Sequence, residues 1–148
     1  MIAIFCLSAQ PAYESTITSS RFSRFAARIL FSNFYSYEHE IQETITEGLT
    51  YIVRKAAHFT EYAVMGFLWY MLLRKKRNNM ILSIGATAFY AASDELHQRF
   101  VVGRSGQLSD VLLDTCGGCF GVISAFILLC IVYCCTDRNI LNWGTWKK

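Results

Sequence analysis

Acidic and imidazole side chains are concentrated in one polar stretch, residues 93 to 114, that lies between two apolar segments. Asp94 and His97 are three residues apart, and Asp110 and Asp114 are four apart, so each pair would share one face of a helix. Paired carboxylate and imidazole groups can transfer protons, hold a metal ion or bind a polar ligand. Charged groups beside lipid-facing residues are costly, so this concentration predicts a functional site.

A second polar group stands at the entrance to the first long apolar segment. His58 and Glu61 are three residues apart and would also share a helical face, and Arg54 and Lys55 precede them. Arginine pairs well with carboxylate and phosphate groups, so these basic residues suit an anionic ligand.

The elements that must hold these groups are membrane helices. The chain has 148 residues, of which 53% are hydrophobic and 17% are charged, and a helix needs about 20 mostly apolar residues to cross a bilayer. We predict an all-α integral membrane helical bundle, one domain over residues 1–148, with about three full spans. The spans are expected at residues 56–73, 80–96 and 111–135, and residues 136–148 as a cytoplasmic tail.

The N-terminal third is expected to differ. Residues 1–8 are apolar but too short to span, so they are interpreted as the remnant of a truncated first span. Residues 9–55 are expected to form an amphipathic segment outside the cytoplasm. In it, Phe22, Phe25 and Ile29 share one helical face while Arg24 and Arg28 lie on another, which fits either an interfacial helix or a helix packed on protein.

The short basic loop of residues 74–77 (Arg-Lys-Lys-Arg) predicts which membrane side each part occupies. Basic loops between spans favour the cytoplasmic side, which places the polar stretch on the outer side. The start of the first span, the end of the second and the start of the third then share one membrane level, so their polar side chains can meet. The candidate catalytic residues are His58, Glu61, Asp94, His97, Asp110 and Asp114. The candidate ligand-binding residues are Arg54, Lys55, Glu95, Gln98 and Arg104.

The six cysteines all lie within or at the end of apolar runs. This placement argues against a disulfide framework. Cys116 and Cys119 have the spacing of a zinc or redox motif, but Gly117, Gly118 and Gly121 beside them favour close helix packing instead.

Several polar motifs in a fixed order resemble the VanZ-like family of small bacterial membrane proteins. The segment 54–62 matches R-K-x-x-H-F-x-E-Y, and the segment 93–98 matches S-D-E-x-H-Q. The Gly-Arg pair at 103–104 and the D-x-x-x-D pair formed by Asp110 and Asp114 follow. The resemblance implies about four membrane helices, a place in the bacterial plasma membrane and an association with resistance to the glycopeptide teicoplanin. It implies no settled reaction, so whether the chain is an enzyme stays open.

Three functions remain open for the predicted site. The first is a binding or resistance module in the cell envelope that takes an anionic ligand, either a lipid-linked, phosphate-bearing precursor or an antibiotic. The second is an acid–base or metal-dependent enzyme acting on such a precursor, with His58, His97 and Asp94 as ligands if a divalent metal is the cofactor. The third is an ion-pair network that only joins helix ends. The lipid bilayer is the expected partner, and nucleic acid is not.

Overall fold

The computed structural model describes residues 12–101 and 106–144. These residues form four α-helices and one short 3-10 helix, and no strand occurs among them: α2 (Ala12–Leu30), η1 (Phe34–Ser36), α3 (His39–Leu73), α4 (Asn79–Gln98) and α5 (Leu108–Gly144). The predicted all-α class is confirmed. Residues 1–8, interpreted as a remnant span, and Arg104 lie outside the described residues.

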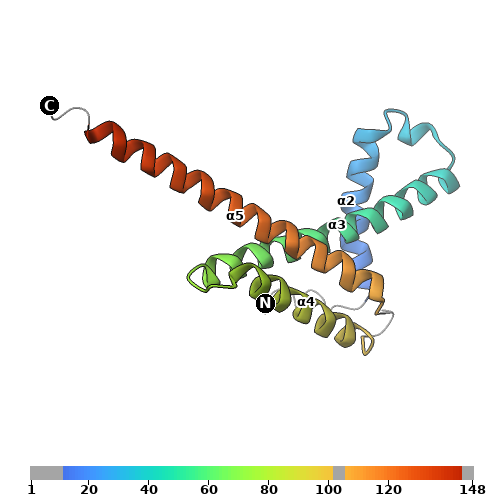
Figure 1. Ribbon diagram of the computed structural model, residues 1–148. Helices are drawn as coiled ribbons and strands as arrows, with labels where there is room; N and C mark the ends of the chain where they lie inside the picture. The colour runs from blue at the N-terminus through green and yellow to red at the C-terminus, as the bar shows by residue number, and fades with distance from the viewer. Residues whose placement is uncertain (1–11, 102–105, 145–148) are drawn as a thin grey trace.

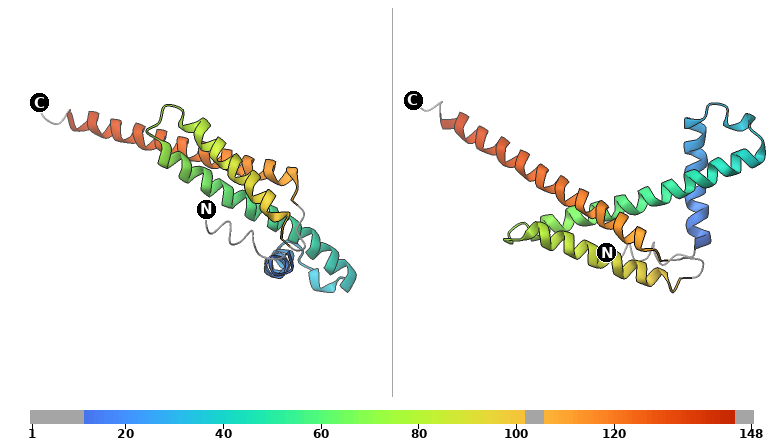
Figure 2. Two further views of the ribbon diagram at one scale, coloured as in Figure 1. Left: turned by 90° about the horizontal axis from the view of Figure 1, so that it is seen from below. Right: turned by 45° about the vertical axis from the view of Figure 1, so that its right-hand side comes forward.

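Three helices form the central bundle. The C-terminal half of α3, all of α4 and the N-terminal half of α5 lie side by side, and α5 continues well past the α3–α4 turn (Figure 1). Helix α2 instead packs on the N-terminal half of α3 and crosses it steeply, so that α2 is seen end-on when the other helices lie in the plane of the picture (Figure 2).

Helix α3 is continuous over 35 residues, about 52 Å at 1.5 Å per residue. The amphipathic segment and the apolar segment that begins near Ala56 were expected as separate elements, and they join without a break. Neither a proline nor a tightly packed glycine interrupts the helix there, since Gly48 has no atoms within 4 Å of the position a Cβ would occupy. The change from an amphipathic to an apolar sequence along α3 therefore reflects its packing partners, which are α2 along the first half and α4 and α5 along the second.

Glycines of α5 allow the bundle helices to approach closely. A Cβ at Gly117 would collide with the main-chain oxygen of Phe59, and one at Gly121 with that of Ala63, both on α3. A Cβ at Gly66 of α3 would collide with the main-chain oxygen of Gly118, and one at Gly118 would collide with the side chain of Thr87 on α4. The packing role predicted for the glycines beside the two cysteines is therefore confirmed.

The interior of this bundle contains polar residues beside apolar ones, and many large apolar residues lie on its outside. The buried residues include these polar ones: Ser83, Thr87, Asp94, Glu95, Gln98 and Asp114. The far half of α5 exposes large apolar side chains, including Phe126, Ile127 and Ile131. Buried acidic side chains together with many exposed large apolar side chains are unusual in water-soluble proteins.

One helix in the described part of the chain, Leu108–Thr136, is long and apolar enough to cross a membrane. The other two spans, at 56–73 and 80–96, stay predictions. Helices α3 and α4 cover these segments, but polar residues lower the mean hydropathy of both. In α3 they stand near the start of the segment, at His58, Thr60 and Glu61, and in α4 they lie on the buried face.

Helix α2 turns its small residues toward α3 and its large apolar residues away from the protein. Ser23 and Ala27 are buried, whereas Phe22, Phe25 and Ile29 are each more than 60% exposed. An outward apolar face is typical of a helix at a membrane interface. Of the two interpretations of this segment, the interfacial one is favoured.

Candidate functional site: an acidic cluster at the helix junction

The polar motifs of α3, α4 and α5 meet where α4 ends and α5 begins. Lys55 comes from α3, Asp94 and Glu95 from the last turns of α4, and Asp110 and Asp114 from the first two turns of α5. We call these five residues the acidic cluster. Their convergence depends on the up-and-down order of the helices, in which α4 runs antiparallel to α3 and α5 returns parallel to α3 (Figure 1).

One ion pair joins α3 to α5 within the acidic cluster. The ammonium group of Lys55 contacts Oδ1 of Asp110, and both side chains are about three-quarters buried. Partial burial strengthens such a pair relative to a surface one. Lys55 also lies over the ring of Tyr51, 5.4 Å from its centroid, so its position is fixed on two sides.

Hydrogen bonds hold the two acids of α4. Gln98 donates from Nε2 to Oδ2 of Asp94 at 3.1 Å, one helical turn away. Oε2 of Glu95 accepts the main-chain N–H of Gln107 at 2.9 Å, which ties the start of α5 to the end of α4. A Cβ at Gly106 would collide with the main-chain oxygen of Glu95, so the chain entering α5 passes directly over that residue.

Asp114 is the most deeply buried acid of the cluster. It is 1% exposed, and neither of its carboxyl oxygens has a hydrogen-bond partner among the described residues. It interacts electrostatically with Glu95, Asp94 and Asp110, and with Lys55 as a positive group. Buried polar groups are rarely left without partners, and exceptions point to a stored cost or a role in function.

Tyr62 is a member of the site that reasoning from the sequence missed. It is fully buried, and its hydroxyl lies in the electrostatic range of Asp94 and Asp114. The signal was present in the family motif at 54–62, of which Tyr62 is the last residue. From the sequence alone, a tyrosine in an apolar segment is interpreted as a core residue. Its position near the acids becomes evident only from the packing of α3 against α4 and α5.

The histidines and Glu61 lie on the same helices as the cluster. His58 is three residues after Lys55 and four before Tyr62, so it shares their face of α3. His58, Glu61 and His97 are all half-buried. Their convergence with the acids on a single site stays a prediction, as does the role of Arg104.

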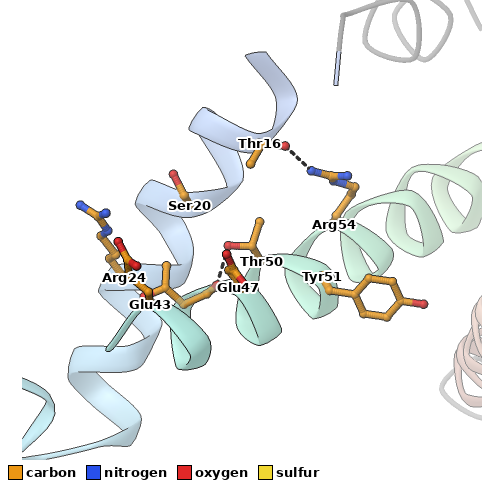
Figure 3. A pocket seen from close by; sticks show the side chains of 9 residues that line it. Thr16, Ser20, Arg24, Glu43, Glu47, Thr50, Tyr51 and Arg54 are labelled. Atoms are coloured by element: carbon orange, nitrogen blue, oxygen red, sulfur yellow. Dashed lines mark hydrogen bonds between the residues drawn. The ribbon is translucent and has the colours of Figure 1, made fainter. Parts of the chain in front are cut away.

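Arg54 lines a different site. Its Nη2 donates to Oγ1 of Thr16 on α2 at 2.7 Å, and the residue borders a pocket of about 410 Å³ between α2 and α3 (Figure 3). It was predicted to bind a ligand together with Arg104. Arg54 faces α2 rather than the acidic cluster, because adjacent residues of a helix point about 100° apart and Lys55 faces the cluster.

The described residues do not fit a metal site. Among residues 12–101 and 106–144, no group of three or more His, Cys, Asp and Glu side chains could hold a metal ion. The acids of the cluster belong to two helices, α4 and α5, and three of them have other partners: Asp94 engages Gln98, Glu95 engages Gln107 and Asp110 engages Lys55. Cys116 and Cys119 are free thiols.

These features define an all-helical, membrane-associated protein with a buried acidic site at one end of its bundle. The family model of VanZ/LLP1 matches residues 1–131, so the chain belongs to the VanZ/LLP1 family. The match covers the whole acidic cluster and confirms the resemblance drawn from the motifs. No curated protein and no solved structure matches the chain.

Proposed function

We propose that this chain is a multi-pass protein of the bacterial plasma membrane that acts as a binding module in the cell envelope. Its family resemblance associates it with resistance to glycopeptide antibiotics. We propose the acidic cluster as its binding site, open to the outer side of the membrane, because the basic sequence of the loop at 74–77 predicts a cytoplasmic position for that loop.

The observation that carries this proposal is that the carboxyl group of Asp114 is buried without a hydrogen-bond partner among the described residues. A carboxyl group that is 1% exposed and has no hydrogen-bond partner among the described residues costs stability wherever it is charged. A residue that only joined helices would be better replaced by asparagine or an apolar residue. A ligand that pairs with Asp114 would account for its retention.

The charge of the cluster favours a ligand with a cationic group. Four carboxyl groups face one ammonium group, and that ammonium contacts Asp110. The sequence predicts an anionic ligand, but Arg54, one of the basic residues on which that prediction depends, lines another pocket. A lipid-linked envelope precursor or an antibiotic that presents an amine to Asp114 and Asp94 satisfies the charge balance.

The test is Asp114→Asn, which keeps the size and polarity of the side chain and removes its ability to ionise. Cells that carry the variant should lose protection against a glycopeptide antibiotic, while the protein reaches the membrane at the wild-type level. Glu40→Gln is the matched control, because Glu40 is an exposed acid of α3 outside the cluster, and it should protect fully. Full protection by Asp114→Asn would refute the proposal.

A structural role is the second candidate, and two contacts favour it. The Lys55–Asp110 pair and the Glu95–Gln107 hydrogen bond both join helices. If this were the whole role of the cluster, Asp114→Asn would keep its protective activity, because Asp114 takes part in neither contact.

The enzyme alternative gives a histidine the central role. His97→Gln keeps hydrogen-bonding capacity and loses the ability to titrate near neutral pH. A binding module should tolerate this change with protection reduced severalfold at most, whereas an acid–base or metal-dependent enzyme should lose it. Complete loss in a well-folded His97→Gln protein would favour the enzyme.

A further inference from the structure

The pocket between α2 and α3 is separate from the acidic cluster, and no role has been assigned to it. It encloses about 410 Å³, which is within the range of small-molecule sites. In Figure 3, Arg54 reaches toward Thr16 at one end of the pocket, Arg24 lies beside Glu43 at the other end, and Glu47 lies between them.

Three hydroxyl groups of this pocket, those of Ser20, Thr46 and Thr50, are available as acceptors rather than donors. Thr46 donates its hydroxyl hydrogen to the main-chain oxygen of Gln42, and Thr50 donates to that of Thr46, both at 2.7 Å. Ser20 on α2 likewise donates to the oxygen of Ile17 at 2.8 Å. Since each hydroxyl has one hydrogen, these oxygens present only lone pairs to the pocket. They complement a group rich in N–H donors.

Glu47 adds a negative charge to this acceptor-rich centre. Within the described residues it forms no ion pair, whereas its neighbour Glu43 pairs with His39 at 3.5 Å. An ammonium group placed between Glu47 and the threonine oxygens would have a counter-charge and hydrogen-bond acceptors together.

Arg54 supplies the opposite charge at the end of the pocket. Within the described part of the chain its Nη2 donates to Thr16, and its Nε is buried and has no hydrogen-bond partner there. A guanidinium group with unused donors is suited to a carboxylate or phosphate. Arg54 and Glu47 are seven residues apart, about 10 Å along α3, so they border one pocket without neutralising each other.

We propose that the α2–α3 pocket binds a zwitterion, with its ammonium group at Glu47 and its carboxylate or phosphate at Arg54. A phosphoethanolamine group has this chemistry, and it can come from a free metabolite or from a lipid headgroup. The inference does not depend on the acidic cluster, because no residue of that cluster lines the pocket.

The experiment is isothermal titration calorimetry on the full chain, purified in a non-ionic detergent free of phosphate. The probes are phosphoethanolamine, inorganic phosphate as the anion alone and ethanolamine as the cation alone. Phosphoethanolamine should bind at least about tenfold more tightly than either part, since a charge-assisted hydrogen bond contributes about 1.5–3 kcal/mol, or tenfold or more in Kd. Equal affinity for inorganic phosphate would overturn the proposal in favour of a plain anion site.

Variants assign the two charges. Glu47→Gln and Arg54→Gln should each weaken phosphoethanolamine binding about tenfold, and Arg54→Lys, which keeps the charge, should weaken it less than Arg54→Gln. Glu40→Gln, one turn before the pocket-lining residues on α3, should bind as the wild type does. Melting temperatures of all variants establish that each is folded. Unchanged binding by folded Glu47→Gln would overturn the ammonium assignment.

Nanodiscs distinguish the two sources of the ligand. If the site takes a lipid headgroup, the melting temperature should rise in discs of phosphatidylethanolamine relative to phosphatidylglycerol, and Arg54→Gln should remove the difference. If it takes a free zwitterion, both discs should give the same melting temperature and soluble phosphoethanolamine should raise it in each. No response to either form would refute the site.

Discussion

The two halves of α5 are built in opposite ways. The first half places Asp110 and Asp114 against α3 and α4 and packs through glycines, so that Val122 and Asp114 are almost completely buried. The second half runs past the bundle (Figure 1) and exposes apolar side chains such as Ile127 and Tyr133, at 50% and 70%. The first half also exposes apolar side chains on its outer face, such as Leu112 at 62%, so the two halves differ in the buried acids and close packing of the first.

This contrast is explained by a lipid environment. In water, exposed apolar residues on a helix would be a liability and buried acids would be rare. In a bilayer the outer surface of a bundle has to be apolar, while polar side chains are accommodated inside it, where they mark functional sites. The contrast within α5 therefore connects membrane insertion to the acidic cluster.

The largest expected effect comes from closing the space at the glycines. Gly121→Val would place a branched side chain against the backbone of Ala63, and neither helix backbone can move without displacing the rest of the bundle. We expect a loss of more than about 3 kcal/mol and little folded protein, measured by yield and melting temperature in detergent.

Gly85→Ala is the matched control, because no atom lies within 4 Å of the position its Cβ would take. Removing a glycine from the interior of α4 should stabilise the protein by up to about 1 kcal/mol. Equal tolerance of Gly121→Val and Gly85→Ala would contradict the close approach of α3 and α5.

The lipid-facing half of α5 is tested by Ile127→Asp. In water, a charge at a half-exposed position changes stability by less than about 0.5 kcal/mol, but in a bilayer it costs about 2.5–3.5 kcal/mol near the helix centre. The fraction of protein that resists extraction from membranes by carbonate should fall sharply for Ile127→Asp and stay unchanged for Ile127→Leu. Normal insertion of Ile127→Asp would place this surface in water.

The ion pair of the acidic cluster is expected to have a smaller effect. Lys55→Met keeps most of the apolar stem and removes the ammonium that contacts Asp110. Loss of the cation from a site with four acids should lower stability by about 1–3 kcal/mol. The pair formed by His39 and Glu43 is mostly exposed, so His39→Gln should leave the melting temperature nearly unchanged. Comparing the losses in melting temperature of Lys55→Met and His39→Gln measures how much more a buried ion pair stabilises the protein than an exposed one.

The sequence predicts much of the local architecture. Apolar runs and charge blocks place both ends of α4, the end of α3 and the start of α5 to within a few residues, whereas α3 begins earlier and α5 ends later than the predicted spans. The i, i+4 spacing puts Asp110 and Asp114 on one face of α5. The glycines beside Cys116 predict close packing, which the structure confirms. These features depend on neighbours in the chain, and helix geometry fixes such neighbours directly.

The tertiary partners of individual residues are less predictable. Arg54 and Lys55 are adjacent in the sequence, yet one binds Thr16 on α2 and the other Asp110 on α5. Nothing local in the sequence specifies that α2 crosses α3 at this point. The pocket at Glu47 and the turn of Tyr62 toward the acids are missed for the same reason, since both arise where helices distant in sequence meet.

The most direct test of the account is the melting temperature of Asp114→Asn in detergent. A buried acid without a hydrogen-bond partner among the described residues, surrounded by three other acids, should be a net cost to folding. The variant should therefore melt at or above the wild-type temperature, by up to about 4 °C for each kcal/mol gained, although it no longer protects cells. A melting temperature several degrees below wild type would contradict the account, because it would make Asp114 part of the scaffold.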